Sequence, residues 1–201
     1  MHEYCVIGHP REKIIFIMAF ISITLAPIVS TIVQTSFQTY FHIVVALTLS
    51  SSSVFAFLYF LFNKYLWRIS IFKKMYSFPD FNGRWECKGK SFNKELNIEF
   101  EWTGTVVITQ TWDKILISLQ TGNSSSRSIS VISGIKYYPG LGYKLSYHYE
   151  NIPMPTATDL KKHEGFCSLV FNENFELADG FYFNNNKERQ TYGEMKLMKG
   201  A

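Results

Sequence analysis

An uncharged run decides the fold of this chain: residues 14–33, IIFIMAFISITLAPIVSTIV, contain no Asp, Glu, Lys or Arg. A second apolar run, residues 41–62, is interrupted only by His42. Because a bilayer core is about 30 Å thick and a helix rises about 1.5 Å per residue, roughly 20 apolar residues span it. We therefore predict a transmembrane helical hairpin, with spans at about 14–33 and 41–62 and a loop at 34–40. A cleaved signal peptide would not explain the second run, and helices of a soluble core would normally show a polar face.

Lysine and arginine residues flank this hairpin on one side only. Arg11 and Lys13 precede the first run, four basic residues lie between Lys64 and Lys74, and the loop has none. This asymmetry predicts that both termini are cytoplasmic. Residues 79–201 hold 14 of the 20 basic and 14 of the 16 acidic residues, so the net charge of +4 comes entirely from residues 1–78. The charge distribution therefore indicates membrane topology and does not favour binding of a nucleic-acid polymer.

Polar and helix-breaking residues lie inside both predicted spans. Pro27 removes one backbone hydrogen bond and should kink the first span. Ser50, Ser51, Ser52 and Ser53 fall at the centre of the second. Their hydroxyls can bond the backbone of their own helix, or the small side chains can form a contact surface between hairpins when copies assemble. The second interpretation makes Pro27 and the four serines candidate oligomerisation residues.

Beyond residue 80, apolar residues recur at every second position, which is the period of a β-strand. Leu96, Ile98, Phe100 and Trp102, for example, alternate with polar residues. Glutamates on the outward parity exclude a barrel embedded in lipid. Short turns predict a soluble, eight-stranded, antiparallel up-and-down β-barrel, so that the chain is a membrane-anchored all-β protein divided into residues 1–78 and 79–201. The expected strands are 82–90, 94–112, 114–121, 127–137, 142–150, 164–172, 175–184 and 190–198.

The sequence lacks the motifs of common enzyme classes. It contains no GxSxG, no glycine-rich phosphate loop and no HExxH, and no carboxylate pair stands apart from the scattered acids. Cys5, Cys87 and Cys167 are widely separated, and the five histidines lack metal-ligand spacing. We therefore expect no catalytic residues, no metal and no cofactor.

Inward-facing positions of the predicted barrel combine aromatic and polar side chains. Gln110 and Asn184 share the parity of several tyrosines and tryptophans. A plain aromatic core would explain this pattern, but buried phenol and indole groups need hydrogen-bond partners, and a nucleobase stacked on such a ring gains about 1–3 kcal/mol. Arg189, at the mouth of a strand, either binds a phosphate or pairs with Glu188 or water. The candidate ligand-binding residues are Gln110, Trp112, Tyr147, Tyr149, Asn151, His163, Tyr182, Asn184, Arg189 and Thr191.

The arrangement resembles the two-transmembrane, β-strand-rich effectors of CBASS anti-phage systems, which are associated with CD-NTase enzymes. The likeness covers nearly the whole chain: the two apolar runs, the basic segment after them, the opening Phe81–Trp85, and the closing segments Gly180–Asn184 and Arg189–Gly193. The opening Gly-x-Trp is shared with lipocalin-like barrels. In such barrels this tryptophan, here Trp85, packs the closed end.

This resemblance implies that the barrel binds a cyclic nucleotide second messenger, for which we expect a cyclic dinucleotide, made by a partner CD-NTase after infection. It also implies a multi-pass protein of the bacterial inner membrane that self-associates on binding, disrupts the bilayer and kills the infected cell. Three alternatives remain open: a membrane-anchored barrel that binds lipid or another hydrophobe, an adaptor that uses the barrel as a protein-contact surface, and a membrane-tethered enzyme.

Overall fold

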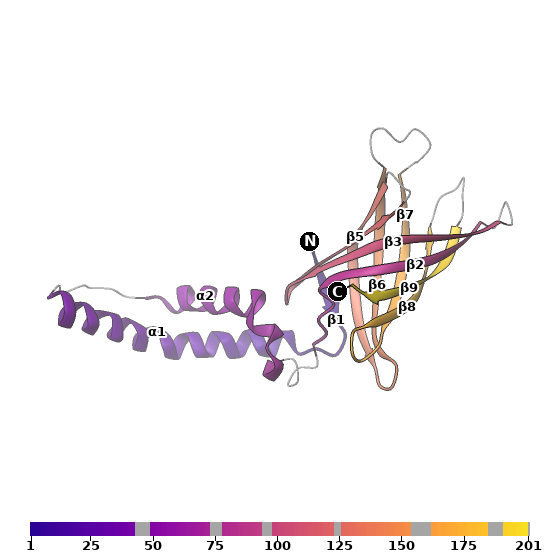
Figure 1. Ribbon diagram of the computed structural model, residues 1–201. Coiled ribbons are helices and arrows are strands. Elements are labelled where there is room, and N and C mark those ends of the chain that lie inside the picture. Colours follow the sequence, from indigo (N-terminus) through magenta and orange to yellow (C-terminus); the bar gives the residue numbers. More distant parts are fainter. Residues whose placement is uncertain are drawn as a thin grey trace. The chain divides into compact units, whose positions relative to one another are not determined.

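The computed structural model describes residues 1–42, 49–72, 78–93, 98–122, 126–153, 162–184 and 191–200. The chain divides into two compact units. The helical unit is His9–Phe78, and the barrel unit combines Met1–Gly8 with Pro79–Ala201. Figure 1 shows the helices of the first unit and the strands of the second.

The helical unit contains a long helix, α1 (Arg11–Phe41), a shorter helix, α2 (Ser51–Lys64), and a single 3-10 turn, η1 (Leu66–Arg68). Helices α1 and α2 lie side by side. The buried residues of α1 recur every fourth position and therefore form one stripe along the helix. They are Ile14, Met18, Ser22 and Ala26.

The predicted hairpin loop at 34–40 is wrong, because α1 continues through it to Phe41. This segment contains no glycine, no proline and no charge, so nothing in it ends the helix. Within the described residues, α1 is the helix that is long and apolar enough to cross a membrane. The predicted second span overlaps residues 43–48, which lie outside the described residues, and α2 itself has 14 residues, about 21 Å of helix.

The four serines lie at the start of α2 and not in the middle of a helix. Ser50 is the N-cap, and its Oγ accepts a hydrogen bond from the Ser53 backbone N–H at 3.2 Å. The Ser50 Oγ also lies 2.9 Å from the Ser52 Oγ and 2.8 Å from the Ser53 Oγ. Serine is a preferred N-cap residue, so the run that we expected in mid-helix starts the helix. Pro27 does lie inside α1, which continues beyond it.

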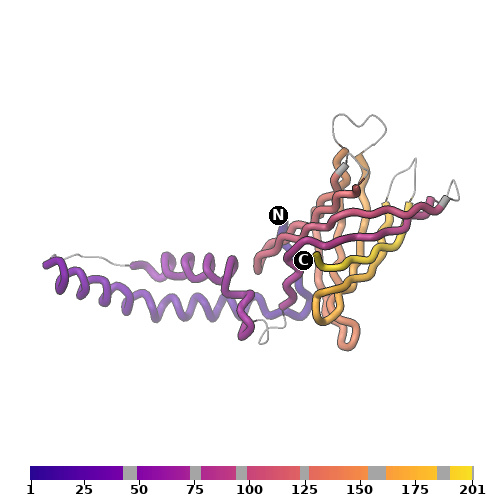
Figure 2. Tube along the Cα trace, viewed as in Figure 1, coloured from indigo at the N-terminus to yellow at the C-terminus, as the bar shows by residue number. Residues whose placement is uncertain are grey.

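In the barrel unit, strands β2 to β8 each pair antiparallel with the next strand along the chain. Strand β9 pairs back onto β2, so the sheet closes into a barrel. Figure 2 shows the same strands as a continuous trace. The strands are β2 (Gly83–Asn93), β3 (Ile98–Gln110), β4 (Lys114–Thr121), β5 (Ser126–Tyr138), β6 (Gly142–Pro153), β7 (His163–Phe171), β8 (Leu177–Asn184) and β9 (Thr191–Lys199).

A ninth strand, β1 (His2–Val6), corrects the predicted strand number, and it lies in the barrel unit. It pairs antiparallel with β4 and parallel with β5. Among the described residues, β4 and β5 pair directly with each other only at Ser118–Gln120 of β4, which leaves backbone groups of both strands free farther along. Strand β1 hydrogen-bonds to these groups, which would otherwise be unsatisfied.

Large side chains fill one end of the barrel, which we call the closed end. Phe81, Trp85 and Phe171 are 0% exposed there. The Trp85 Nε1 donates to the Phe81 carbonyl at 3.1 Å, and the Trp85 and Phe171 rings meet edge to face with centroids 5.0 Å apart. Trp85 therefore packs the closed end, as the Gly-x-Trp opening predicts.

Candidate functional site

The opposite end of the barrel interior is lined by polar and aromatic side chains, and we call it the polar end. Strand β2 ends there at Asn93, and β9 begins there at Thr191. Its inward-facing residues come from β2, β3, β5, β6, β7, β8 and β9. They are Ser91, Asn93, Trp102, Ser128, Tyr149, Asn151, His163, Tyr182, Asn184 and Thr191.

One wall of the polar end is a hydrogen-bonded cluster of Ser91, Trp102 and Tyr182. The Trp102 Nε1 donates to the Ser91 Oγ at 2.9 Å and to the Tyr182 hydroxyl at 3.2 Å. The hydroxyls of Ser91 and Tyr182 share a hydrogen bond. Burial raises the pKa of Tyr182, so the phenol remains protonated at neutral pH. The cluster is therefore uncharged and presents hydroxyl groups beside an indole ring.

A second wall is built around Asn151 on β6. Its Oδ1 accepts from the Ser128 Oγ at 3.2 Å, and its Nδ2 lies 3.4 Å from the His163 Nδ1. The Tyr149 hydroxyl donates to the Phe183 carbonyl at 3.5 Å, and burial raises the pKa of this phenol too. The Ser128, Tyr149 and Asn151 side chains of this wall offer neutral donors and acceptors.

The neighbouring pair Asn184 and Thr191 joins β8 to β9 at the mouth. The Asn184 Nδ2 donates to the Thr191 Oγ1 at 2.5 Å, and the Thr191 backbone N–H donates to the Asn184 Oδ1 at 2.9 Å. These bonds hold both side chains in place at the edge of the interior.

Two glycines allow the aromatic rings to lie close against the wall. A Cβ on Gly89 would lie 2.2 Å from the Trp102 ring, and one on Gly165 would lie 2.4 Å from the Tyr149 hydroxyl. Such distances are well below van der Waals contact, so a side chain at either position would push the ring toward the interior. The glycines therefore keep space open at the polar end.

The chemistry of this lining suits a planar, polar molecule. Ring faces and edges offer stacking, and the amide and hydroxyl groups offer hydrogen bonds in both directions. Among the described lining residues, none is Lys or Arg. In the described part of the chain, no three His, Cys, Asp or Glu side chains group as metal ligands.

Six of the ten predicted ligand-binding residues meet at the polar end: Tyr149, Asn151, His163, Tyr182, Asn184 and Thr191. Tyr147 lies deeper in the barrel, 5% exposed, with its ring centroid 6.5 Å from that of Tyr149. Trp112 is buried near the closed end, at the turn between β3 and β4. Arg189 lies outside the described residues.

Gln110 belongs to the closed end and does not line the polar end. Its Nε2 donates to the Tyr4 hydroxyl at 2.9 Å and to the Pro79 carbonyl at 3.0 Å, and its Oε1 accepts from the Phe81 N–H at 2.9 Å. These bonds tie β1 and the entry to β2 onto β3. Alternation along a strand shows that a side chain faces inward but not which end of the barrel it is near. Parity alone therefore could not assign Gln110 to the closed end.

Sequence reasoning missed four lining residues. The first predicted strand stopped at residue 90, so Ser91 and Asn93 were not assigned to it. Trp102 was recognised as inward-facing but not selected. Ser128 carries a misleading signal, because its alternation with Ile129 and Val131 assigns Ser128 and Ser130 to the solvent face, whereas Ser130 is buried and Val131 is 44% exposed.

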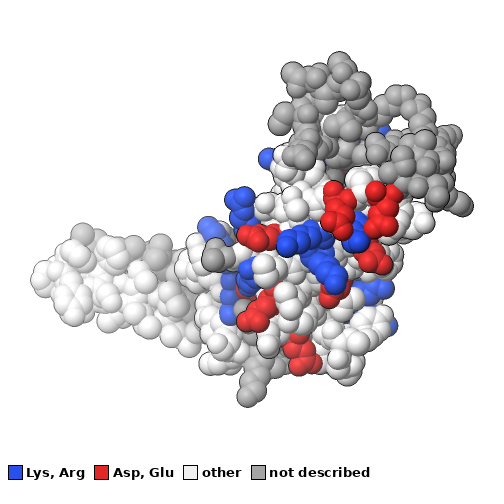
Figure 3. All heavy atoms as spheres, turned by 45° about the vertical axis from the view of Figure 1, so that its right-hand side comes forward, with Lys and Arg blue, Asp and Glu red and all other residues white. Residues whose placement is uncertain are grey.

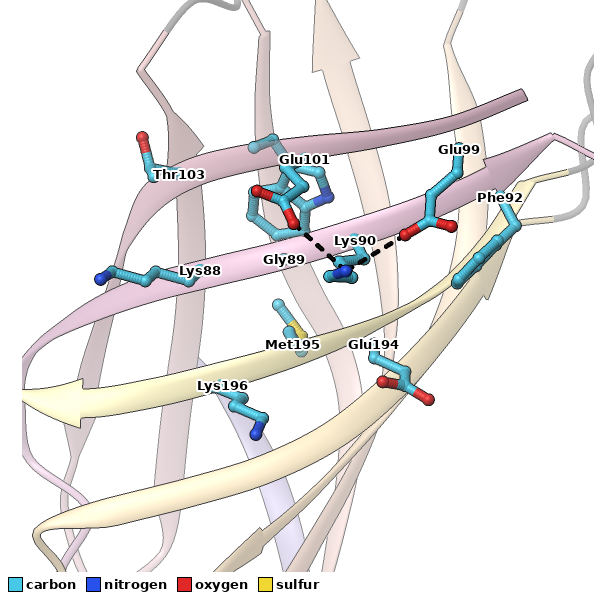
Figure 4. Close-up of a pocket in the computed structure, with 11 residues that line it drawn as sticks. Lys88, Gly89, Lys90, Phe92, Glu99, Glu101, Thr103, Glu194, Met195 and Lys196 are labelled. Carbon is cyan, nitrogen blue, oxygen red and sulfur yellow. Dashed lines mark hydrogen bonds and ion pairs between the residues drawn. The ribbon is translucent and has the colours of Figure 1, made fainter.

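A groove lies on the outer face of β2, β3 and β9 (Figure 4). In it the Lys90 Nζ lies 3.2 Å from the Glu99 Oε1 and 3.1 Å from the Glu101 Oε1. The hydrogen bonds to Glu101 and Glu99 raise the pKa of Lys90. Figure 3 shows acidic and basic side chains interspersed over this part of the barrel. The groove encloses about 700 Å³ and is lined by Lys88, Gly89, Lys90, Phe92, Glu99, Glu101, Trp102, Thr103, Glu194, Met195 and Lys196.

Comparison with known protein families identifies the relatives of both units. Residues 76–199 match the family model described as "Cap15, cyclic dinucleotide receptor domain", and residues 12–68 match "Cap15, TM helices". The chain belongs to the Cap15 family. This assignment confirms the predicted resemblance to CBASS effectors and places the chain in a family described by a receptor domain.

One curated Cap15 relative is the CD-NTase-associated protein 15 of Yersinia aleksiciae. It is 36% identical over 151 residues, which cover 75% of this chain and 70% of that protein. Among solved structures, a DUF3598-family protein of unknown function from Nostoc punctiforme is 11% identical, with a TM-score of 0.35 over 59% of this chain. The match spans about half of that structure, 47%, and is too distant to support a comparison of function.

Proposed function

We propose that this Cap15 protein is a membrane-anchored anti-phage effector whose barrel binds a cyclic dinucleotide at the polar end. The observation that carries the proposal is the lining of that end. It combines aromatic rings with hydrogen-bonded, uncharged amide and hydroxyl groups, within a segment that matches a cyclic dinucleotide receptor domain. The ligand would be the product of a partner CD-NTase.

Each part of such a ligand has a matching group in the proposed site. The rings of Trp102 and Tyr182 suit a base, and the Asn151 and Asn184 amides can bond its polar edge. Phosphate oxygens accept hydrogen bonds, which the Thr191 hydroxyl can donate. Arg189, two residues before Thr191 in the sequence, stays a predicted phosphate contact.

We further propose that α1 and the segment after it hold the protein in the bacterial inner membrane as a multi-pass anchor with both termini cytoplasmic. The flanking basic residues and the match to Cap15 TM helices support this topology. Ligand binding would promote self-association, and the assembled hairpins, with Pro27 and the serine run at their contacts, would disrupt the membrane.

Replacing Ser51 and Ser52 with Leu retains the Ser50 N-cap. This variant should bind ligand normally and lose toxicity; persisting toxicity would show that these serines are only structural.

The binding test is thermal unfolding of the full chain in detergent micelles with a panel of cyclic dinucleotides, their linear counterparts and a fatty acid. A ligand of the folded barrel stabilises it by about 2.7 kcal/mol at 100 times its dissociation constant. We expect a rise in melting temperature with one cyclic dinucleotide and none with its linear form. Stabilisation by the fatty acid alone would indicate a lipid-binding barrel, and no stabilisation by any compound would indicate a protein adaptor.

A further inference from the structure

Four aromatic residues form a row across the outside of the barrel. Phe166 on β7 pairs with Phe183 on β8, Phe183 pairs with Tyr192 on β9, and Tyr192 pairs with Phe92 on β2. Ring centroids are 5.6 Å apart in both the Phe166–Phe183 and the Phe92–Tyr192 pair. Phe181 lies beside this row, two residues before Phe183 on the same strand. We call these five residues the aromatic row.

The aromatic row faces away from the barrel interior. Phe181, Phe183 and Tyr192 are 48%, 47% and 51% exposed, while their strand neighbours Tyr182 and Gly193 face inward. Single exposed apolar residues are ordinary, but a contiguous apolar patch on a soluble surface marks an interaction site. The aromatic row faces away from the interior site, so ligand binding in the interior does not explain its exposure.

The outer groove borders the aromatic row directly. Phe92 belongs to both, and Phe181 is the cross-strand partner of Glu194, which lines the groove. A ridge, Phe181 with Phe183, therefore lies next to a hollow on the same face. Such a surface is complementary to itself, because a two-fold axis places the ridge of each copy in the groove of the other.

The charges around the groove favour a protein partner over an anionic bilayer. Three lysines and three glutamates line the groove, so its formal charge is zero. The residue next to Phe92 across the sheet is Glu99, and the one next to Phe181 is Glu194. A groove of zero net charge gains little from the anionic cytoplasmic leaflet, whereas the Phe92 ring and the aliphatic stems of the lysines can pack against phenyl side chains.

We propose that a second copy of this chain docks on this face, with Phe181 and Phe183 of each copy inserted into the groove of the other. The inference deepens the self-association step of the proposed function and rests on it only for the role of ligand. A two-fold axis roughly along the strands would leave both barrels pointing the same way. Two copies anchored in one membrane require that arrangement.

The first test compares Phe181→Glu with Leu177→Glu in the full chain in detergent micelles. Both residues face outward on β8 and are similarly exposed, 48% and 51%, but only Phe181 borders the groove. Light scattering at increasing protein concentration measures the dissociation constant of the dimer. We expect Phe181→Glu to raise it at least about tenfold, as loss of a central interface aromatic commonly does, and Leu177→Glu to leave it unchanged.

The second test is a disulfide between two different chains. One chain carries Phe181→Cys, the other Thr103→Cys, and both carry Cys5→Ser. Within one chain the two positions are three strands apart, about 14 Å, too far for a disulfide. Burial raises the pKa of Cys87 and Cys167 to about 12, so these thiols stay protonated. We expect a cross-link only when the two variants are mixed.

The outcomes separate this interface from the ligand proposal. If both glutamate variants have the mass distribution of the unsubstituted chain and no mixed cross-link forms, the interface is wrong, whatever the cyclic dinucleotide panel shows. A chain that is monomeric at every concentration and with every compound in the panel also overturns it. If Phe181→Glu weakens assembly while no compound raises the melting temperature, the interface stands and the ligand proposal fails.

Discussion

The two ends of the barrel share one architecture but differ in how they use their inward-facing side chains. At the closed end, Phe81, Trp85 and Phe171 fill the interior by ring packing. At the polar end, residues such as Asn151 and Tyr182 are held by side-chain hydrogen bonds near strand ends. The alternation of a strand decides which residues enter the barrel, and the position along the strand decides whether they belong to the core or to the candidate site.

The largest effect that this comparison predicts is the loss of Trp85. Replacing it with Ala removes a fully buried ring and its bond to Phe81, which should cost about 3–5 kcal/mol of unfolding free energy. For a chain of this size that corresponds to a melting temperature lower by about 10 °C. Near-ultraviolet circular dichroism of the full chain in micelles measures it. The folded fraction should still bind ligand, and a selective loss of binding without destabilisation would place Trp85 in the site.

A smaller loss is expected for Gln110→Leu. This change keeps the approximate volume but removes the partners of the Phe81 N–H and the Pro79 carbonyl, at about 1–3 kcal/mol for each buried group. The same melting experiment measures the destabilisation, and titration with the best ligand of the panel measures affinity. Unchanged affinity is expected, whereas a large loss in a fully folded variant would restore Gln110 to the ligand site.

Much of the barrel could be predicted from the period of its sequence. The predicted strand 114–121 coincides with β4, and the predicted 127–137 lies within β5. Strand β1 was missed because its five residues bury only Tyr4, so no alternating pattern shows. The long α1 was missed because polar residues at 34–40 resemble a turn, although none of them breaks a helix.

Only part of the candidate site could be predicted. Tyr149 and Asn151 were among the predicted ligand-binding residues, and the structure places both at the polar end. Gln110 was selected on parity and lies at the other end, because distance along the barrel depends on where each strand begins. The pairing of Ser91 with Tyr182 joins positions 91 residues apart, and no local pattern in the sequence reports such a contact.

The finest comparison deletes one phenolic hydroxyl at each end. In Tyr4→Phe the closed end loses a donor to the Thr111 carbonyl and an acceptor for Gln110. In Tyr182→Phe the polar end loses the partner shared by Ser91 and Trp102. Each should cost about 0.5–1.5 kcal/mol of stability, the usual contribution of such hydrogen bonds.

Ligand affinity should then distinguish variants that stability does not. Tyr182→Phe removes a hydroxyl that we place in the ligand site, and a site hydrogen bond of about 1.4 kcal/mol corresponds to a tenfold change in dissociation constant. Tyr4→Phe should bind as the unsubstituted chain does. Equal affinity in the two variants would mean that the ligand does not contact the Tyr182 hydroxyl. Weaker binding by Tyr4→Phe alone would move the ligand to the closed end, where the present packing leaves the core residues fully buried and a ligand would have to displace them.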